Sequence, residues 1–264
     1  MKNKLHQAIH YLKHTLVATR KGHGVHSPFA YRLCEEVFYN RHPFYAFEHL
    51  AAERKKLLQD KHLILMKDFG AGSNTFRSNE RRVCDICRHG ISSKKQSEIL
   101  YRLINFLQSK TIVELGTSIG LNTMYLASVH PGNHVVSIDA CDDLIAYARQ
   151  LSKANNLMNI TFMCDMFDGA LPTVLQKYAP FDLVYIDGNH SYEATVAYFH
   201  TLLQCLHQDA VIVFDDIYWR AGMTKAWQEI KSHPAVKLSI DTYHSGYVFF
   251  KEELKEKQHF RFWV

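Results

Sequence analysis

Three short apolar segments in the second half of the chain each end in acidic or glycine-rich residues, which are residue types that can do chemistry. They span residues 113–120, 184–190 and 211–216 and read VELGTSIG, VYIDGNH and VIVFDD. Apolar runs of this length are typical of buried parallel strands. Ligands of open α/β sheets bind beyond the carboxyl ends of such strands. The pattern therefore predicts an acid-rich, metal-binding site beside a nucleotide-type pocket.

The first segment predicts a glycine loop directly after a strand. Gly116 and Gly120 lie four residues apart, with Thr117 and Ser118 between them. A dinucleotide-binding fingerprint requires a glycine where this chain has Ser118. Gly116 would let a ligand approach the backbone closely, and Gly120 would open the next helix. A plain tight turn is the alternative interpretation.

This loop resembles motif I of the class I S-adenosylmethionine-dependent methyltransferases, in which an acid, here Glu114, ends the first strand. Asp139 matches the family's acid for the ribose hydroxyls, and helix capping is its alternative role. Asp165 matches the position that meets the adenine amino group, with Asp168 as its competitor. The resemblance implies S-adenosylmethionine as cofactor and the following contacts: Glu114, Gly116, Thr117, Ser118, Gly120, Asp139, Asp165 and Asp187.

The second and third segments place three carboxylates at the ends of two neighbouring strands. Asp187 ends one strand, and Asp215 and Asp216 end the next. Three converging carboxylates repel one another unless a positive charge lies between them. A hard divalent cation such as Mg²⁺ would supply that charge and would also lower the pKa of a bound substrate hydroxyl. Capping of a loop by the aspartate pair is the alternative.

The arrangement is similar to that of the metal-dependent O-methyltransferases of the catechol and caffeoyl-CoA types. Residues 187–193 look closer to the macrocin-type sugar O-methyltransferases, where a His three residues after the first Asp is the proposed base. The resemblance implies that Asp187, Asp215 and Asp216 bind the metal and that His190 is the general base. A neutral imidazole is suited to accept a hydroxyl proton near neutral pH. Capping of the following helix is the alternative role of His190.

These residues predict S-adenosylmethionine-dependent methyl transfer to an oxygen of a small molecule. Amino-methyltransferases of nucleic acids usually carry an Asn/Asp-Pro-Pro-aromatic motif after the fourth strand, where this chain has Asp187-Gly188-Asn189-His190. That difference argues against this class. An RNA ribose or protein methyltransferase, and a cofactor-binding protein without catalysis, stay open as alternatives.

The composition sets limits on partners and location. The formal charge of +5 permits an anionic partner without requiring one, so nucleic-acid binding is unsupported but open. No apolar stretch approaches the ~18 residues of a membrane span, and the N-terminus lacks the apolar core of a signal peptide. We therefore expect a cytoplasmic protein with a small-molecule acceptor and no membrane partner. A homodimer is left open.

The elements that must position these residues alternate between strand and helix from residue 97 onward. This alternation predicts an α/β fold with a Rossmann-like, doubly wound, seven-stranded sheet of order 3-2-1-4-5-7-6 and an antiparallel last strand. We assign residues 96–264 to the methyltransferase domain and residues 1–95 to a helical or lid extension. Leu5, Ile9, Leu12 and Leu16 recur at helical spacing and predict an amphipathic helix.

Two motifs of the extension are predicted to carry no site. Residues 68–73 read DFGAGS but lack a following helical pattern, so they are interpreted as a flexible loop or lid. Cys84 and Cys87 have the CxxC spacing of a metal or redox pair. A zinc site normally needs four ligands and the chain offers no second pair, so both thiols are expected to be reduced and unliganded.

Overall fold

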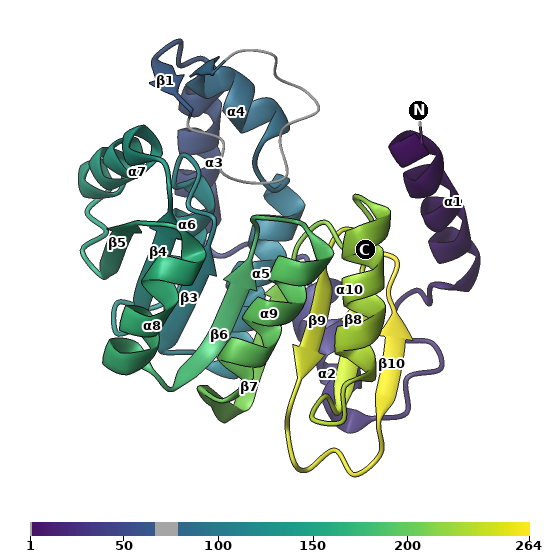
Figure 1. The fold of residues 1–264 in the computed structure, drawn as a ribbon. Helices are drawn as coiled ribbons and strands as arrows, with labels where there is room; N and C mark the ends of the chain where they lie inside the picture. Colours follow the sequence, from purple (N-terminus) through teal and green to yellow (C-terminus); the bar gives the residue numbers. More distant parts are fainter. Residues whose placement is uncertain (1, 67–78) are drawn as a thin grey trace. The chain divides into compact units, whose positions relative to one another are not determined.

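The computed structural model describes residues 2–66 and 79–264 (Figure 1). It divides into two compact units, one formed by residues 1–40 with 179–264 and the other by residues 41–178. We call them the terminal unit and the central unit and describe each by itself. The predicted loop at 68–73 lies outside the described residues. The predicted boundary between residues 95 and 96 remains a prediction, since these units divide the chain on a different basis.

The central unit is built on three parallel strands, β3 (Thr111–Leu115), β4 (His134–Asp139) and β5 (Ile160–Cys164). Ile112 and Val135 face each other across β3 and β4, and both are fully buried. Branched apolar side chains suit strands that are covered on both faces. These pairings are the ones that the predicted order requires of its first three strands.

Helices follow each of these strands and complete the central unit. They are α6 (Leu121–Ala127), α7 (Asp142–Ala154) and α8 (Phe167–Tyr178), preceded along the chain by α3 (Tyr45–Leu57), β1 (Leu63–Leu65), β2 (Glu80–Arg82), α4 (Val83–His89) and α5 (Lys94–Leu107). Ser93 and Gln96 cap α5 reciprocally, which fixes its start. The short elements β2 and α4 were not predicted. Cys84 and Cys87 lie buried in α4 as free thiols.

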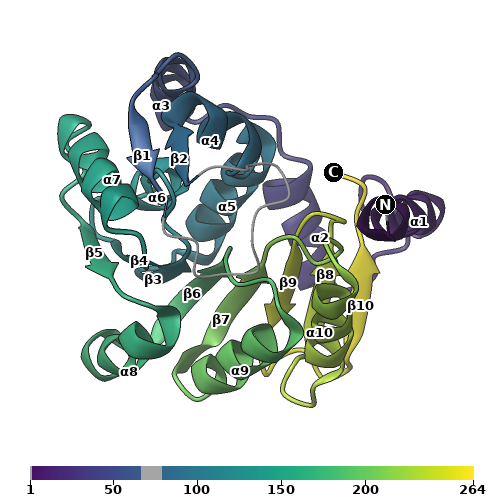
Figure 2. The ribbon, with the colours of Figure 1, turned by 45° about the horizontal axis from the view of Figure 1, so that its top comes forward.

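The terminal unit contains five strands, β6 (Phe181–Ile186), β7 (Leu206–Phe214), β8 (Leu238–Asp241), β9 (Gly246–Phe249) and β10 (Gln258–Arg261), which lie side by side in Figure 2. β6 and β7 are parallel, and β9 pairs antiparallel with both β7 and β8. The predicted antiparallel final hairpin is therefore present. β10 adds a parallel strand beside β8 that was not predicted, because its sequence QHFR has no apolar alternation.

The helices of the terminal unit are α1 (Lys2–Val17), α2 (Pro28–Leu33), the π-helical turn η1 (Cys34–Phe38), α9 (Tyr192–Leu203) and α10 (Ala221–Ser232). The N-cap residue of α9 is Ser191, whose hydroxyl accepts a hydrogen bond from the backbone N–H of Ala194. Strands alternate with helices from β6 to α10, as they do from β3 to α8. The predicted α/β class is confirmed.

Candidate active site

The predicted glycine loop of the central unit adopts backbone conformations that favour glycine. Gly116 and Gly120 have φ values of 111° and 81°, and Ser118 between them has φ 49°. A Cβ on Gly120 would lie 2.6 Å from the Cβ of Ala148, so a side chain there would push α6 away from α7. Gly120 is the N-cap residue of α6, as predicted. Thr117 is buried, and its Oγ1 lies 2.6 Å from the hydroxyl of Ser137, so its side chain faces the interior.

Glu114 lies inside β3 rather than at its end, and its carboxyl is completely buried. Its Oε2 accepts hydrogen bonds from the hydroxyls of Ser137 (2.5 Å) and Thr123. Burial outweighs these bonds and raises the pKa of Glu114 to about 8. The carboxyl is therefore mainly protonated at neutral pH. The hydrogen bonds of this carboxyl connect β3 to β4 and α6, so Glu114 stabilises the packing of the central unit.

Asp139 ends β4, as predicted, and its carboxylate holds the glycine loop. Oδ2 accepts a hydrogen bond from the Ser118 N–H (3.0 Å), and Oδ1 accepts one from the Cys141 N–H (3.0 Å). Burial raises the pKa of this carboxyl, while the backbone N–H bonds oppose that shift. The N-cap residue of α7 is Cys141, so Asp139 supports the start of that helix from outside. Each carboxylate oxygen can accept a further bond, for instance from a ribose hydroxyl.

Asp165 directly follows β5 and lies beside Asp139. Its backbone N–H donates to the carbonyl oxygen of Asp139 (3.1 Å), so the ends of β4 and β5 are joined at this point. A Cβ on Gly169 would lie 2.8 Å from both carboxylate oxygens of Asp165, so a side chain at position 169 would displace this carboxylate. Asp168, its predicted competitor, lies in the first turn of α8.

In the terminal unit, Asp187 and Asp215 meet at the hydroxyl of Tyr185. The Tyr185 Oη lies 3.1 Å from Asp187 Oδ2 and 2.9 Å from Asp215 Oδ2. A phenol carries one proton and can donate to one carboxylate at a time. The buried Ser245 hydroxyl donates to Asp215 Oδ1 at 2.7 Å. Asp215 therefore has a protein contact at each oxygen. We call Asp187, Asp215, Asp216 and His190 the acidic cluster.

Asp216 completes this group of carboxylates. Its φ of 55° lies in the left-handed region, which aspartate adopts more readily than most residues other than glycine. Burial and the neighbouring charge of Asp215 raise the pKa of Asp216 to about 7. Crowding of like charges at the end of β7 is thus partly relieved by proton uptake.

His190 lies among these carboxylates. Its Nε2 is 3.7 Å from Asp187 Oδ1, and its ring meets the indole of Trp219 edge-on, with centroids 5.4 Å apart. Burial lowers the pKa of His190; the charge of Asp215 opposes that shift and the guanidinium of Arg220 adds to it. The imidazole is therefore neutral near pH 7. The alternative that His190 caps α9 is wrong, since Ser191 does so.

The predicted metal ligands are neighbours but do not form a coordination sphere as they lie. Among the described residues no group of three or more His, Cys, Asp or Glu side chains is arranged to hold a metal ion. The Tyr185 and Ser245 hydroxyls contact the oxygens of Asp215 that a cation would need. These side chains would have to rearrange to bind Mg²⁺. The metal site therefore stays a prediction.

Three residues around the acidic cluster were not predicted as site residues from the sequence: Tyr185, His244 and Ser245. Tyr185 lies two residues before Asp187, and alternation along a strand places both on the same face, which was a usable signal. Ser245 and His244 come from the turn between β8 and β9, about thirty residues after Asp215. The charge of Asp215 acts on His244, but burial is the larger effect and lowers the pKa of this imidazole. No local pattern marks these two residues.

Comparison with known proteins agrees with this geometry. Residues 113–217 match the family model described as a methyltransferase domain. A Mycobacterium tuberculosis catechol O-methyltransferase is 29% identical over 133 residues, which are 50% of this chain and 59% of that protein. The chain thus spans less than two thirds of the length of this curated relative.

Solved structures share the fold at low sequence identity. The O-methyltransferase TomG from Streptomyces achromogenes superposes with a TM-score of 0.54 at 20% identity, covering 62% of this chain and 82% of its own. An O-methyltransferase from Bacillus cereus gives a TM-score of 0.53 at 18% identity, covering 80% and 93%. The predicted Rossmann-like class is confirmed by these neighbours. Residues 113–217 are similar to a methyltransferase domain, and the predicted resemblance of the chain to the class I S-adenosylmethionine-dependent O-methyltransferases is confirmed.

Proposed function

We propose that this protein transfers a methyl group from S-adenosylmethionine to a hydroxyl oxygen of a small molecule, with His190 as general base. The observation that carries the proposal is a neutral, largely buried imidazole 3.7 Å from a carboxylate at the end of β6. An acceptor hydroxyl needs such a base, because an alkoxide or phenoxide is a far better nucleophile than the alcohol. The methyltransferase-domain match supports the class of reaction.

The central unit fits the cofactor. Gly116 leaves the first position of the loop after β3 without a side chain, and Asp139 and Asp165 place two carboxylates at adjacent strand ends. The expected contacts of these carboxylates are the ribose hydroxyls and the adenine amino group, both of which are hydrogen-bond donors. When bound, S-adenosylmethionine supplies an electrophilic methyl group on a sulfonium.

The proton transfer uses the chain's own residues. One imidazole nitrogen of His190 takes the acceptor's hydroxyl proton, and the imidazolium is then stabilised by the Asp187 carboxylate at 3.7 Å. The oxygen forms its bond to the methyl carbon as the carbon–sulfur bond breaks, and that electron pair stays on sulfur. The products are a methyl ether and S-adenosylhomocysteine. Alignment of the acceptor oxygen supplies much of the acceleration.

Catechols are the first acceptors to test. The relatives from Mycobacterium tuberculosis and Niastella koreensis are both named catechol O-methyltransferases, at 29% and 27% identity. Two vicinal hydroxyls would also meet two acceptors in the acidic cluster, because Asp187 and Asp215 lie on either side of the Tyr185 hydroxyl. Sugars with vicinal hydroxyls are the second class to test.

Metal assistance is a separate part of the proposal. Asp187, Asp215 and Asp216 are the residues that would hold Mg²⁺, and the ion would supply charge stabilisation of a deprotonated acceptor. Initial rates measured with Mg²⁺ and with EDTA test this part alone. Equal rates under the two conditions would show that the reaction needs no metal, and deprotonation of the acceptor would then depend on His190 alone.

The main test is a radiolabelled methyl-transfer assay on the purified chain, combined with calorimetric titration of S-adenosylhomocysteine. We expect cofactor binding and acceptor-dependent methyl transfer to a catechol or a vicinal diol. Absence of cofactor affinity would overturn the proposal. Cofactor affinity without turnover on any acceptor would favour a cofactor-binding protein without catalysis. Turnover on RNA or protein would show that the acceptor is a macromolecule and not a small molecule.

A further inference from the structure

The N-terminal helix α1 packs on the terminal unit through its polar face. His6 Nε2 lies 2.9 Å from the hydroxyl of Thr224, and the Gln7 amide donates to the carbonyl oxygen of Trp219 (3.0 Å). The ring of His10 stacks on Tyr218 with centroids 4.7 Å apart. These contacts involve three polar side chains of α1, which is unusual for an amphipathic helix on a protein body.

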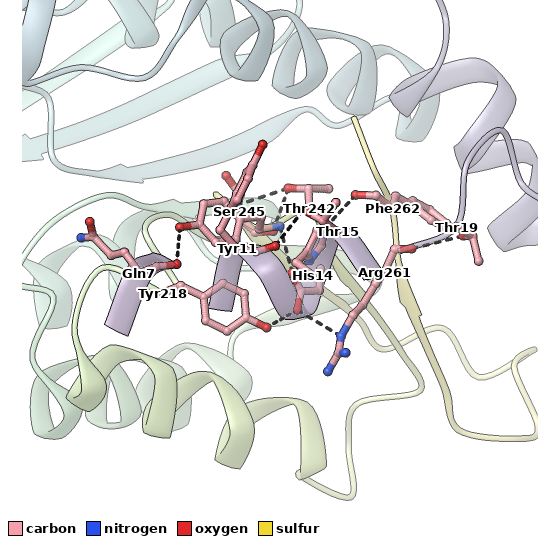
Figure 3. Close-up of polar contacts among 12 residues, drawn as sticks. Gln7, Tyr11, His14, Thr15, Thr19, Tyr218, Thr242, Ser245, Arg261 and Phe262 are labelled. Atoms are coloured by element: carbon pink, nitrogen blue, oxygen red, sulfur yellow. Dashed lines mark hydrogen bonds and ion pairs between the residues drawn. The ribbon is translucent and has the colours of Figure 1, made fainter. Parts of the chain in front are cut away.

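His14 is the centre of this contact (Figure 3). Its Nδ1 lies 3.2 Å from Asp241 Oδ1, and its Nε2 lies 3.2 Å from the carbonyl oxygen of Phe262. Burial raises the pKa of Asp241, but hydrogen bonds from His14 and Tyr218 outweigh it and hold that pKa below its usual value. His14 and Asp241 are both almost inaccessible to solvent. The orientation of α1 is therefore fixed by a buried polar network.

The apolar face of α1 consequently points away from the protein. At 3.6 residues per turn, the four aliphatic residues at positions 5, 9, 12 and 16 share one face, and His14 lies on the opposite one. Leu5, Leu12 and Leu16 are 65%, 61% and 76% exposed, and Ile9 is 44% exposed. We call these four side chains the apolar stripe. Six of the twelve exposed large hydrophobic side chains of the described chain belong to α1, so this is the strongest concentration of uncovered apolar surface.

The charged side chains on α1 and directly after it are all positive. Lys4 and Lys13 are exposed on α1, and Arg20 and Lys21 follow it. The first acidic residue of the whole sequence is Glu35. An apolar face flanked by lysines, with no acid on the same helix, is complementary to a partner that has an apolar layer beneath an anionic surface.

We propose that α1 binds the interface of an anionic lipid membrane, with the apolar stripe among the acyl chains and its lysines at the headgroups. The helix of 16 residues, about 24 Å long, would lie in the membrane plane. The proposal is independent of methyl transfer. The sequence predicts no membrane partner because it has no spanning segment, and no helix of the described chain is long and apolar enough to cross a bilayer. A helix that lies in the membrane interface does not need to be long or apolar enough to cross the bilayer.

A second copy of this chain fits the apolar stripe less well. Two α1 helices packed face to face would bring lysines together with no acidic side chain on either helix to pair with them. Four aliphatic side chains on each copy also bury far less than the roughly 800 Å² per partner of a stable interface. Anionic lipid satisfies both the charge and the apolar surface.

Vesicle co-sedimentation of the full chain tests this proposal. The vesicles are phosphatidylcholine alone, or phosphatidylcholine with about 30% phosphatidylglycerol, at low and high salt. Wild type should bind only the anionic vesicles, more weakly at high salt. Leu5→Gln/Leu12→Gln/Leu16→Gln and, separately, Lys4→Glu/Lys13→Glu should each lower the partition coefficient roughly tenfold or more.

Matched controls separate α1 from general surface properties. Met158→Gln removes an apolar side chain that is 83% exposed in the central unit, and Lys55→Glu/Lys95→Glu changes the net charge as the α1 lysine variant does. Both should bind like wild type. Circular dichroism and thermal melting of every variant verify that the fold is kept, and Leu12→Gln alone serves if the triple variant does not fold.

Three results would overturn the proposal. One is no binding of wild type to anionic vesicles, and another is unchanged binding by the leucine variants. The third is a wild-type dimer in sedimentation velocity that the leucine variant dissociates, with no vesicle binding by either, because the apolar stripe would then be covered by a second copy.

Discussion

The strand ends of the two compact units both carry aspartates, but their surroundings differ. In the central unit, Asp139 accepts two backbone N–H groups, and Asp165 is held beside it by a main-chain bond. In the terminal unit, Asp187 and Asp215 share one tyrosine hydroxyl, and Asp216 has a pKa raised to about 7. In the central unit, backbone N–H groups fix the Asp139 carboxylate. In the terminal unit, several carboxylates crowd together beside the neutral imidazole of His190.

This difference indicates that the two groups of aspartates have different functions, ligand binding in the central unit and reaction in the terminal unit. Carboxylates held by backbone groups keep a fixed geometry in which they can accept hydrogen bonds from a ligand. Carboxylates that crowd a histidine respond to a proton or a cation, which is what a reaction site requires. We therefore expect variants of the central unit to change cofactor affinity, and variants of the acidic cluster to change turnover. The following predictions test that division.

The largest expected effect is that of His190→Ala. Loss of the general base should lower kcat by roughly 10²–10⁴-fold and leave S-adenosylhomocysteine affinity unchanged. Since burial lowers the pKa of His190, the acidic limb of the wild-type kcat/KM profile should lie below 6.5 and vanish in the variant. His207→Ala is the matched control, because His207 lies 3.8 Å from Asp182 on the same unit. An equal loss in both variants would remove the special role of His190.

The next effect concerns stability and the buried carboxyl of Glu114. Its pKa is raised from 4.5 to about 8 in the folded chain, so the stabilisation that it gives is complete below pH 4.5 and is lost as pH rises through 8. Between these limits the free energy of unfolding of wild type should fall, relative to Glu114→Gln, by on the order of a few kcal/mol. Denaturant unfolding at several pH values measures this. Glu48→Gln, on the exposed side of α3, is the control for a change from carboxyl to amide.

A smaller effect is expected for Asp139→Asn. The amide removes the charge and one acceptor for a ribose hydroxyl, so the Kd of S-adenosylhomocysteine should rise about tenfold. Turnover at saturating cofactor should change much less. Calorimetry measures the affinity, with Asp209→Asn as the control, because Asp209 pairs with Lys251 in the other unit. A normal Kd together with a large loss of kcat would contradict the assignment of this edge to the cofactor.

The smallest effect is expected for Tyr185→Phe. The ring stays buried in β6, but Asp187 and Asp215 lose the hydroxyl between them. We expect kcat to fall several-fold, roughly the effect of one hydrogen bond on His190 positioning. Tyr125→Phe removes the same atom from a buried tyrosine of α6 and should leave kcat unchanged. A shift of the kcat pH profile only in Tyr185→Phe would distinguish positioning from packing.

The sequence alone determined the repeated strand–helix units and the positions of the strand-end residues. Strands β3 to β7 each contain an apolar run that ends at or next to the predicted residues, because buried strands need such runs. Asp139, Asp187 and Asp215 were found for this reason. β10 was not found because its sequence has no apolar alternation, and α4 was not found because its burial depends on residues of other elements, such as Leu50 and Tyr101.

Only the tertiary structure decided what surrounds each of these residues. Glu114 is interior because β4 and α6 close over it, and Asp215 has contacts at both oxygens because Ser245 arrives from a distant turn. The spacing of α1 shows that the helix has an apolar face, but the buried contact of His14 with Asp241 turns that face outward. Periodicity reports which residues share a face, whereas the competition among long-range contacts decides which face is buried.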